Sequence, residues 1–166
     1  KQIHKTLGLD EQEWPVKKSQ YFINQHKEKG MRANDIKVQG NPRTYQLKQI
    51  MQDYEAHCQR AMLVDFTELL LRCYELLRDN DASRSELQQQ FQYLLIDEFQ
   101  DFSLLFQQTI DAVRNGNSAL QCFCVGDDWQ AINRFAGSDL KFFDQFSENF
   151  EDTLRLNLST NYRSAR

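Results

Sequence analysis

The spacing of apolar residues changes part-way along the chain, and this change limits the folds that it can adopt. Up to about residue 88, apolar side chains recur every three or four residues, which is the period of an amphipathic helix. Beyond that point, short continuous apolar runs alternate with helical stretches, which is typical of a parallel sheet with crossover helices. We therefore expect an α/β protein with a helical unit, residues 1–88, followed by a unit with a parallel sheet, residues 89–166.

Charge and aromatic content follow the same division. The net charge of −4 comes from the second unit, which also holds most of the 12 phenylalanines. Such an asymmetry supports two units with different cores. The chain has no apolar run of about 18 residues and no basic-then-apolar N-terminus, so the sequence predicts neither a membrane span nor a signal peptide. We expect an intracellular globular protein.

Three helices are expected in the first unit. The first should span residues 15–29, with a proline in its first turn and a glycine after its end. The apolar spacing predicts a second helix over residues 43–60 and a third after Asp65. Asp65 followed three residues later by Glu68 resembles a capping box at the start of the third helix. Taken alone, this unit could also be a plain helical bundle.

The second unit begins with an apolar run that predicts a strand buried on both faces. The expected elements are strands over residues 93–96, 119–125 and 153–158 and helices over residues 104–114 and 139–146. Ser103 is the expected N-cap of the first of these helices. In such sheets ligands bind beyond the carboxyl ends of the strands. The polar residues that follow the three strands are therefore expected to lie together at one site.

The first strand ends in an acidic pair, Asp97 and Glu98. An aspartate in this place can hold a hydrated magnesium ion beside the phosphates of a nucleotide. The adjacent glutamate can polarise an attacking water, because its carboxylate accepts the hydrogen bond or the proton of that water. The pair could also do no more than begin a solvated turn.

The two later strands are followed by amide, aromatic and basic residues. Gln130 can donate and accept hydrogen bonds at once, so it could sense a terminal phosphate. Trp129 and Phe135 would be stacking platforms for a nucleobase if exposed, and part of the core if buried. Tyr162 can stack on a purine, and Arg163 can stabilise charge on a transferring phosphoryl group.

Three segments resemble, in order, motifs II, III and IV of the UvrD/Rep group of superfamily 1 DNA helicases. They are LLIDEFQD at residues 94–101, VGDDWQAI at residues 125–132 and LSTNYRS at residues 158–164. The first unit also resembles the helical 1B subdomain of that group, notably at residues 40–42 and 63–71, and residues 129–135 are nearer to the helicase IV branch. The resemblance implies that the sheet is part of a RecA-like domain, 1A.

The resemblance implies roles at a nucleotide site. Asp97 would help to place Mg²⁺, and Glu98 would activate the water that attacks the γ-phosphate of ATP. Arg163 would contact that phosphate, and Tyr162 would stack near the adenine. The catalytic residues would then be Glu98, Asp97 and Arg163, with Asp97 at the metal.

The resemblance also implies a path to DNA. Gln100 and Gln130 would bind at the nucleotide and link its state to the DNA site. Phe135 occupies the place of a DNA-stacking tryptophan in UvrD-like proteins. Asn133 stands where the UvrD pattern has a tyrosine, and Ala136 stands where it has an arginine. The single-strand contacts at these two positions therefore depart from the pattern.

The phosphate-binding signature G-x-x-x-x-G-K-[S/T] is absent, because none of the six glycines is followed by a lysine. The backbone amides and the lysine that hold the β- and γ-phosphates are then missing. The family places that loop before 1B and a second RecA-like domain after motif IV. We therefore expect a fragment, most of 1B and the later part of 1A, of a longer helicase that uses ATP and Mg²⁺.

The parent would translocate 3′ to 5′ on single-stranded DNA and separate duplex DNA in the bacterial cytoplasm, at the nucleoid. The fragment would work with the remaining helicase domains as its partners, and by itself it would hydrolyse ATP negligibly and unwind nothing. The incomplete sheet would expose apolar surface, so the fragment could self-associate.

Two other functions stay open from the sequence. A metal-dependent phosphohydrolase or nuclease would need no phosphate loop. Its carboxylate cluster would consist of Asp97, Glu98, Asp101, Asp127 and Asp128. A non-catalytic interaction module derived from a helicase would instead serve as a scaffold. The acidity of the second unit argues against strong unaided binding of nucleic acid, because that affinity depends on neutralising phosphates.

Overall fold

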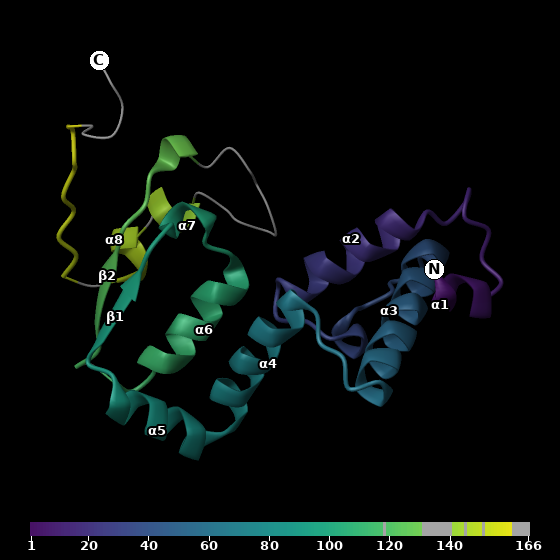
Figure 1. Cartoon of the computed structure of the whole chain (residues 1–166), viewed down its shortest axis with the longest axis horizontal. Coiled ribbons are helices and arrows are strands. Elements are labelled where there is room, and N and C mark those ends of the chain that lie inside the picture. Colours follow the sequence, from purple (N-terminus) through teal and green to yellow (C-terminus); the bar gives the residue numbers. More distant parts are fainter. Residues whose placement is uncertain (118, 131–140, 145, 151, 161–166) are drawn as a thin grey trace.

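The computed structural model describes residues 1–117, 119–130, 141–144, 146–150 and 152–160 (Figure 1). The helices are α1 (Gln2–Thr6), α2 (Val16–Lys27), α3 (Pro42–Arg60), α4 (Phe66–Asp79), α5 (Asp81–Gln90), α6 (Leu104–Arg114), α7 (Lys141–Asp144) and α8 (Phe146–Asn149). The strands are β1 (Tyr93–Ile96) and β2 (Gln121–Cys124), and short 3-10 turns cover Ala33–Asp35, Phe99–Asp101 and Asp128–Gln130. The fold is mixed α/β, mostly helical, with helices before a small parallel sheet, as predicted.

The helices of the first half begin where their capping residues lie. Asn41 caps α3, because its side chain accepts hydrogen bonds from the amides of Arg43 and Thr44 at 2.9 and 3.3 Å. Asp65 caps α4 by accepting the amide of Glu68 at 2.6 Å. The predicted capping box is only half right, since the Glu68 carboxylate binds the basic side chains of Lys27, Arg32 and Arg72 instead of serving this N-cap.

The helices expected over residues 43–60 and 104–114 are confirmed as α3 and α6. Ser103 caps α6 as predicted, since its hydroxyl accepts the amide of Phe106 at 3.3 Å. α2 starts after Pro15 and ends at Lys27, slightly before the predicted end. The part of the expected helix 139–146 that the structure describes is helical, as α7 and the start of α8.

A helix that the apolar spacing does not predict, α5, follows α4 directly. Asn80 ends α4 and caps α5, because its side chain accepts the amide of Ser83 at 2.9 Å. None of the residues of α5 is buried. A polar sequence with so few apolar side chains shows no helical stripe, although Leu87 does pack against a core cluster.

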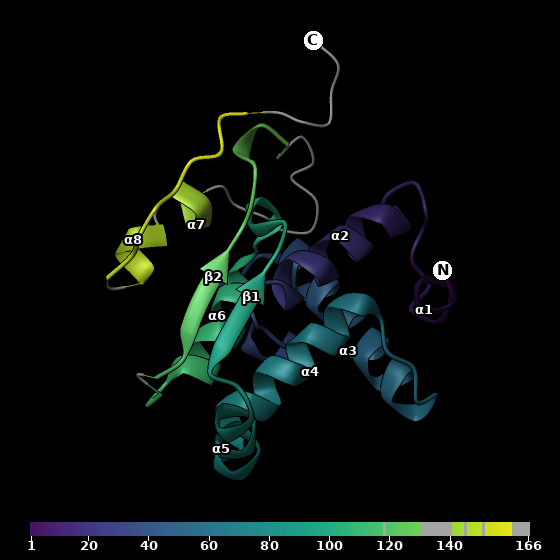
Figure 2. The ribbon, with the colours of Figure 1, turned by 60° about the vertical axis from the view of Figure 1, so that its left-hand side comes forward.

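Three apolar clusters form the core of the part of the chain that the structure describes. The first joins α2, α3 and the turn between them: Ile23, Ala33, Ile36, Ile50 and Met51. The second lies on one side of the sheet: Phe99, Phe102, Ile110, Phe142 and Phe150. The third joins Leu77 of α4 to Val113 of α6 and to Leu120. Figure 2 shows α4 and α5 beside α6, so the third cluster ties the helical half to the sheet half.

The two strands are parallel, with Tyr93 opposite Gln121 and Ile96 opposite Cys124. α6 connects them and lies along one face of the sheet (Figures 1 and 2). A parallel pair requires such a crossover, because the chain must return to the same end before the second strand begins. β2 is shorter than the predicted strand over residues 119–125.

One face of this sheet is open in the described part of the chain. Leu94 and Ile96 pack in the core clusters, whereas Tyr93, Leu95 and Phe123 are exposed. The prediction that the strand at residues 93–96 is buried on both faces is therefore wrong for this chain. The helices that the structure describes against the sheet cover only the side of Leu94 and Ile96.

The strand expected over residues 153–158 is not formed. The described sheet contains only β1 and β2, and residues 153–160 form neither helix nor strand. Leu154, Leu156 and Leu158 are exposed. A strand requires a neighbour that accepts and donates its backbone hydrogen bonds, and no described segment serves as that neighbour here.

Among the described helices, none is long and apolar enough to cross a lipid bilayer.

Candidate functional site

The ends of β1 and β2 meet at one edge of the sheet, as predicted. The amide of Val125 donates to the carbonyl of Ile96 at 2.8 Å, and the amide of Phe99 donates to the carbonyl of Val125 at 2.9 Å. These two bonds continue the ladder past the strands, so the segment after β1 stays against the segment after β2. Two of the three polar segments that the sequence placed at a site are therefore neighbours.

Gln100 bridges these two segments with a single side chain. Its Nε2 donates to Oε2 of Glu98 at 2.5 Å, and its Oε1 accepts the backbone amide of Asp127 at 2.9 Å. The residue is only 3% exposed. A buried carboxamide would be destabilising without partners, and here both of its polar atoms have one. Gln100 therefore fixes the acidic pair after β1 to the loop after β2.

Glu98 has an unusual backbone conformation for a residue with a side chain. Its φ of 51° and ψ of 41° lie in the left-handed region, which costs a non-glycine residue about 1–2 kcal/mol. Its amide donates to Oδ1 of Asp97 at 2.9 Å. The bonds to Asp97 and Gln100 hold Glu98 in this conformation, and strained residues of this kind cluster at functional sites.

Gly126 lets the loop after β2 come close to Gln100. A Cβ atom at this position would lie 2.8 Å from Oε1 and 3.1 Å from the backbone nitrogen of Gln100, and 2.9 Å from Cε2 of Phe143. Real Cβ atoms do not come within 3.0 Å of such atoms. Any side chain here would therefore force the side chains of Gln100 and Phe143 to shift, so glycine allows the close approach of the two chain segments.

Gln130 is held within its own loop. Its Nε2 donates to Oδ2 of Asp127 at 2.7 Å, while the amide of Trp129 donates to Oδ1 of Asp127 at 3.1 Å. The side chain of Gln130 is exposed, and so is the ring of Trp129. The alternative that the Trp129 ring is part of the core is therefore wrong. Gln130 lies in the loop after β2, beside Asp127, where a ligand bound at this edge of the sheet could contact it.

The remaining predicted site residues, Asn133, Phe135, Tyr162 and Arg163, lie outside the residues that the structure describes. The roles given to them stay predictions. Within the described residues, no group of three or more histidine, cysteine, aspartate or glutamate side chains could hold a metal ion. The carboxylate-cluster alternative therefore gains no support from this part of the chain.

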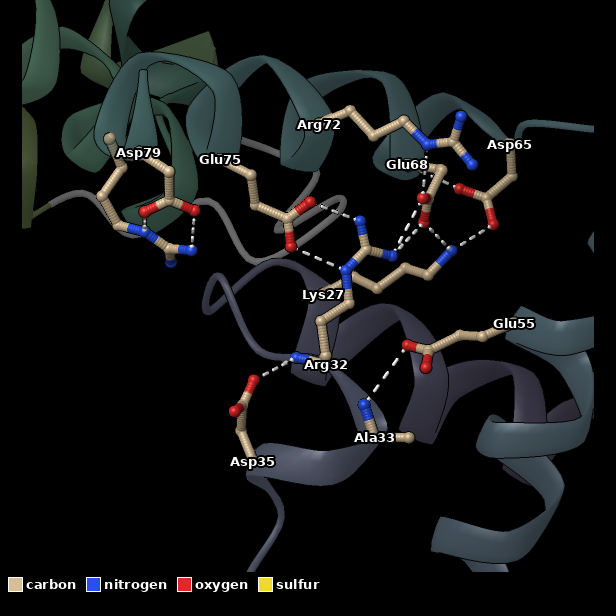
Figure 3. Close-up of polar contacts among 11 residues, drawn as sticks. Lys27, Arg32, Ala33, Asp35, Glu55, Asp65, Glu68, Arg72, Glu75 and Asp79 are labelled. Carbon is tan, nitrogen blue, oxygen red and sulfur yellow. Dashed lines mark hydrogen bonds and ion pairs between the residues drawn. The ribbon is translucent and has the colours of Figure 1, made fainter. Parts of the chain in front are cut away.

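The sequence did not indicate a second polar cluster, which lies between the first helices and α4 (Figure 3). The Nζ atom of Lys27 lies 2.8 Å from Oδ2 of Asp65 and 2.8 Å from Oε2 of Glu68, and the lysine is only 1% exposed. Arg32 binds Glu68 at 2.9 Å and holds Glu75 through two bonds of 2.6 and 2.7 Å. This charge network fixes α4 against α2 and the turn that follows it.

The network shifts the pKa of its carboxyl groups. Burial alone would raise the pKa of Glu68, but hydrogen bonds from Lys27, Arg72 and Arg32 outweigh it, so the pKa is lowered. Asp65 follows the same pattern, because bonds from Lys27 and from the hydroxyl of Tyr54 outweigh its burial. Both carboxyl groups are therefore ionised and paired near neutral pH. Only the Glu68–Arg72 pair, one helical turn apart, was visible in the sequence spacing.

Comparison with known proteins gives the family. The chain matches the UvrD/REP helicase N-terminal domain over residues 1–151. It is 33% identical to DNA helicase II of Escherichia coli over 164 residues, which is 99% of this chain and 22% of that protein. It is 36% identical to DNA helicase II of Haemophilus influenzae over 165 residues, again 99% of this chain and 22% of that protein.

DNA helicase IV of Escherichia coli is 37% identical over 100 residues, which is 60% of this chain and 14% of that protein. The chain thus spans about a fifth of the length of the DNA helicase II relatives that it matches. The family match covers most of the chain, including every described element up to α8. This chain belongs to the family of UvrD/REP helicase N-terminal domains.

Proposed function

We propose that this chain is part of an ATP-dependent DNA helicase and that the edge after β1 and β2 is the nucleotide-binding edge of a RecA-like domain. The bridge that Gln100 makes between Glu98 and Asp127 carries this proposal. The acidic pair and the loop that carries Gln130 thereby lie together at the carboxyl end of parallel strands, where such sheets bind ligands. The names of the relatives, which are DNA helicases, support the same function.

Each residue at this edge has a proposed task. Asp97 would help to hold Mg²⁺, which neutralises charge on the β- and γ-phosphates when it is bound. Glu98 would orient the attacking water, because a carboxylate that accepts a hydrogen bond from Gln100 on one oxygen keeps the other for that water. Arg163 would contact the γ-phosphate, and Tyr162 would stack near the adenine.

The link from nucleotide to DNA would start at Gln100. Its hydrogen bond with the Asp127 amide means that a shift of Glu98 on nucleotide binding would move the loop that carries Gln130. Phe135 and Asn133 follow in the same segment of the sequence and would contact single-stranded DNA. The parent protein would thereby couple hydrolysis to 3′ to 5′ movement and to the separation of duplex DNA.

These 166 residues contain no phosphate-loop signature, so we propose that by themselves they hydrolyse ATP negligibly and depend on the remaining helicase domains. We assign residues 1–88 to a 1B-like subdomain and residues 89–166 to part of domain 1A. The relatives named above are bacterial, which supports a place in the bacterial cytoplasm with the nucleoid DNA.

A substitution in the full-length protein tests the proposal. Glu98→Gln keeps the size of the side chain and removes its basicity, so DNA-stimulated ATP hydrolysis should fall by about 100-fold or more while ATP binding persists. Glu86→Gln, at an exposed position of α5, is the matched control and should hydrolyse ATP at the parent rate. Wild-type hydrolysis in the Glu98→Gln protein would contradict the proposal, as would DNA-stimulated hydrolysis by the isolated 166 residues.

A further inference from the structure

The side chain of Trp129 is 88% exposed, although tryptophan side chains are on average highly buried. The other tryptophan of the chain, Trp14, packs against the first apolar cluster, and Cζ of Arg43 lies 5.4 Å from the centroid of its ring. Trp129 has no such place in the core. Its indole therefore presents a large flat face on which another ring can stack.

The turn that carries Trp129 is fixed to the edge of the sheet after β1 and β2. The amide of Trp129 donates to Oδ1 of Asp127 at 3.1 Å, and the amide of Asp127 donates to Oε1 of Gln100 at 2.9 Å. Because Gln100 is only 3% exposed, these bonds connect the exposed residue to a buried anchor. A residue on a fixed backbone loses less conformational freedom when a ligand binds than one on a free loop.

These bonds also separate the Trp129 ring from the base of a nucleotide bound at this edge. Gln100 donates to Oε2 of Glu98 at 2.5 Å, and Glu98 is the residue to which we assign the water at the γ-phosphate. Trp129 is therefore connected to the phosphate end of the site. The base of a nucleoside triphosphate lies at the opposite end of the molecule from its γ-phosphate. The ring is thus available to a base of a second ligand, and Phe135, a proposed DNA contact, follows six positions later.

We propose that Trp129 stacks on an unpaired base of single-stranded DNA. This inference rests on the helicase function proposed above. A base in a single strand can rest on an aromatic ring, and such stacking accepts every base because each has a π-face, which suits a protein that moves along any sequence. The carboxylates of Asp97, Glu98 and Asp127 disfavour phosphates nearby, so the contact is made through the base and not through the DNA backbone.

Binding of fluorescently labelled oligothymidylate to the full-length protein, measured by anisotropy at several salt concentrations, tests this role. In Trp129→Ala the dissociation constant should rise about 5- to 150-fold, the effect of one lost base stack. Trp129→Phe keeps an aromatic ring and should lose less affinity. The slope of log Kd against log salt should stay at the wild-type value in both variants, because stacking neutralises no phosphate. Tyr45→Ala removes an exposed ring of α3 and should bind as the wild type does.

The contrary results overturn the proposal. Wild-type affinity in Trp129→Ala, equal losses in Trp129→Ala and Trp129→Phe, a changed salt slope, or an equal loss in Tyr45→Ala would each do so. A loss of ATP affinity without a loss of DNA affinity would place the ring at the nucleotide instead. DNA-stimulated ATP hydrolysis by the wild type separates the two proposals. If it is present and Trp129→Ala binds DNA normally, only the stacking is wrong, whereas its absence overturns the helicase function and the stacking together.

The variants are expected to remain folded. The ring of Trp129 is exposed, so both substitutions should leave the melting temperature at the wild-type value. A lower affinity would then report the loss of the ring and not the loss of the fold.

Discussion

The carboxamide of Gln100 donates a 2.5 Å hydrogen bond to the carboxylate of Glu98, and this bond determines how the acidic end of β1 is presented. Glu98 has a left-handed backbone that is unfavourable for a glutamate. A buried amide that holds the carboxylate in place compensates for that conformation. The same side chain also binds the loop after β2, so the two strand ends form one structural unit. A substitution in either strand end should therefore disturb the other.

Gln100→Ala should remove the side-chain bridge between the two strand ends. It leaves the amide of Asp127 without its acceptor and opens a small gap in a buried place, so the free energy of unfolding should fall by about 1–3 kcal/mol. Urea denaturation measures this loss. Gln130→Ala is the control, since that side chain is exposed, and it should change stability by less than about 0.5 kcal/mol. Equal stabilities for the two variants would show that the bridge does not stabilise the fold.

Gly126→Ala should disturb the same unit by steric overlap. The added Cβ would lie 2.8 Å from Oε1 of Gln100 and 2.9 Å from Cε2 of Phe143, so both side chains must move, at a cost of about 1–3 kcal/mol in stability. Combining Gly126→Ala with Gln100→Ala removes one of the two overlaps. The double variant should therefore be more stable than the sum of the single effects predicts. Additive effects, measured by urea denaturation, would contradict the close packing.

Local signals predicted much of the fold. Asp65 and Ser103 cap helices that begin where the sequence places them, because a cap needs only its own next few residues. β1 coincides with the predicted run at residues 93–96. The edge where Asp97 and Glu98 lie was also predictable, since it follows from the direction of parallel strands.

The features that the sequence did not predict depend on distant partners. Lys27 pairs with Glu68, 41 positions away, and no local pattern connects them. The exposed sheet face is another case. A continuous apolar run predicts a strand buried on both faces, but the run itself does not show whether a helix covers each face. α5 was missed for a different reason: its sequence has no apolar stripe, although the adjacent Asn80 caps it and Leu87 packs against a core cluster.

The charge network should make stability depend on acid pH. The pKa values of Glu68 and Asp65 are lower in the folded chain than their ordinary values of 4.5 and 3.8. Their ion pairs therefore stabilise the fold fully above those ordinary values, and this stabilisation is lost as pH falls through the lowered ones. Glu55 opposes the trend, because burial raises its pKa.

Glu68→Gln isolates this effect. At pH 7 the variant should be less stable by up to about 3 kcal/mol, since Lys27 and Arg32 lose a shared charged partner. The difference from the wild type should begin to shrink below pH 4.5, where Glu68 of the unfolded chain takes up a proton, and should vanish once pH has fallen through the lowered pKa of the folded chain. Glu86→Gln, at an exposed position, should leave the pH profile unchanged. A difference that stays constant from pH 7 to pH 3, measured by thermal melting, would exclude the network as its source.

The open sheet face should make the chain self-associate. Tyr93, Leu95 and Phe123 stand together on neighbouring strands and are exposed, and apolar patches of this kind promote association. Leu95→Lys should shift the chain toward monomer in sedimentation velocity, because a charge at the centre of the patch would be costly to bury. Tyr21→Lys alters an exposed aromatic residue of α2 away from the sheet and should leave association as it was. A wild-type chain that is monomeric at all concentrations would show that the face does not mediate association, and equal effects of both variants would place the contact elsewhere.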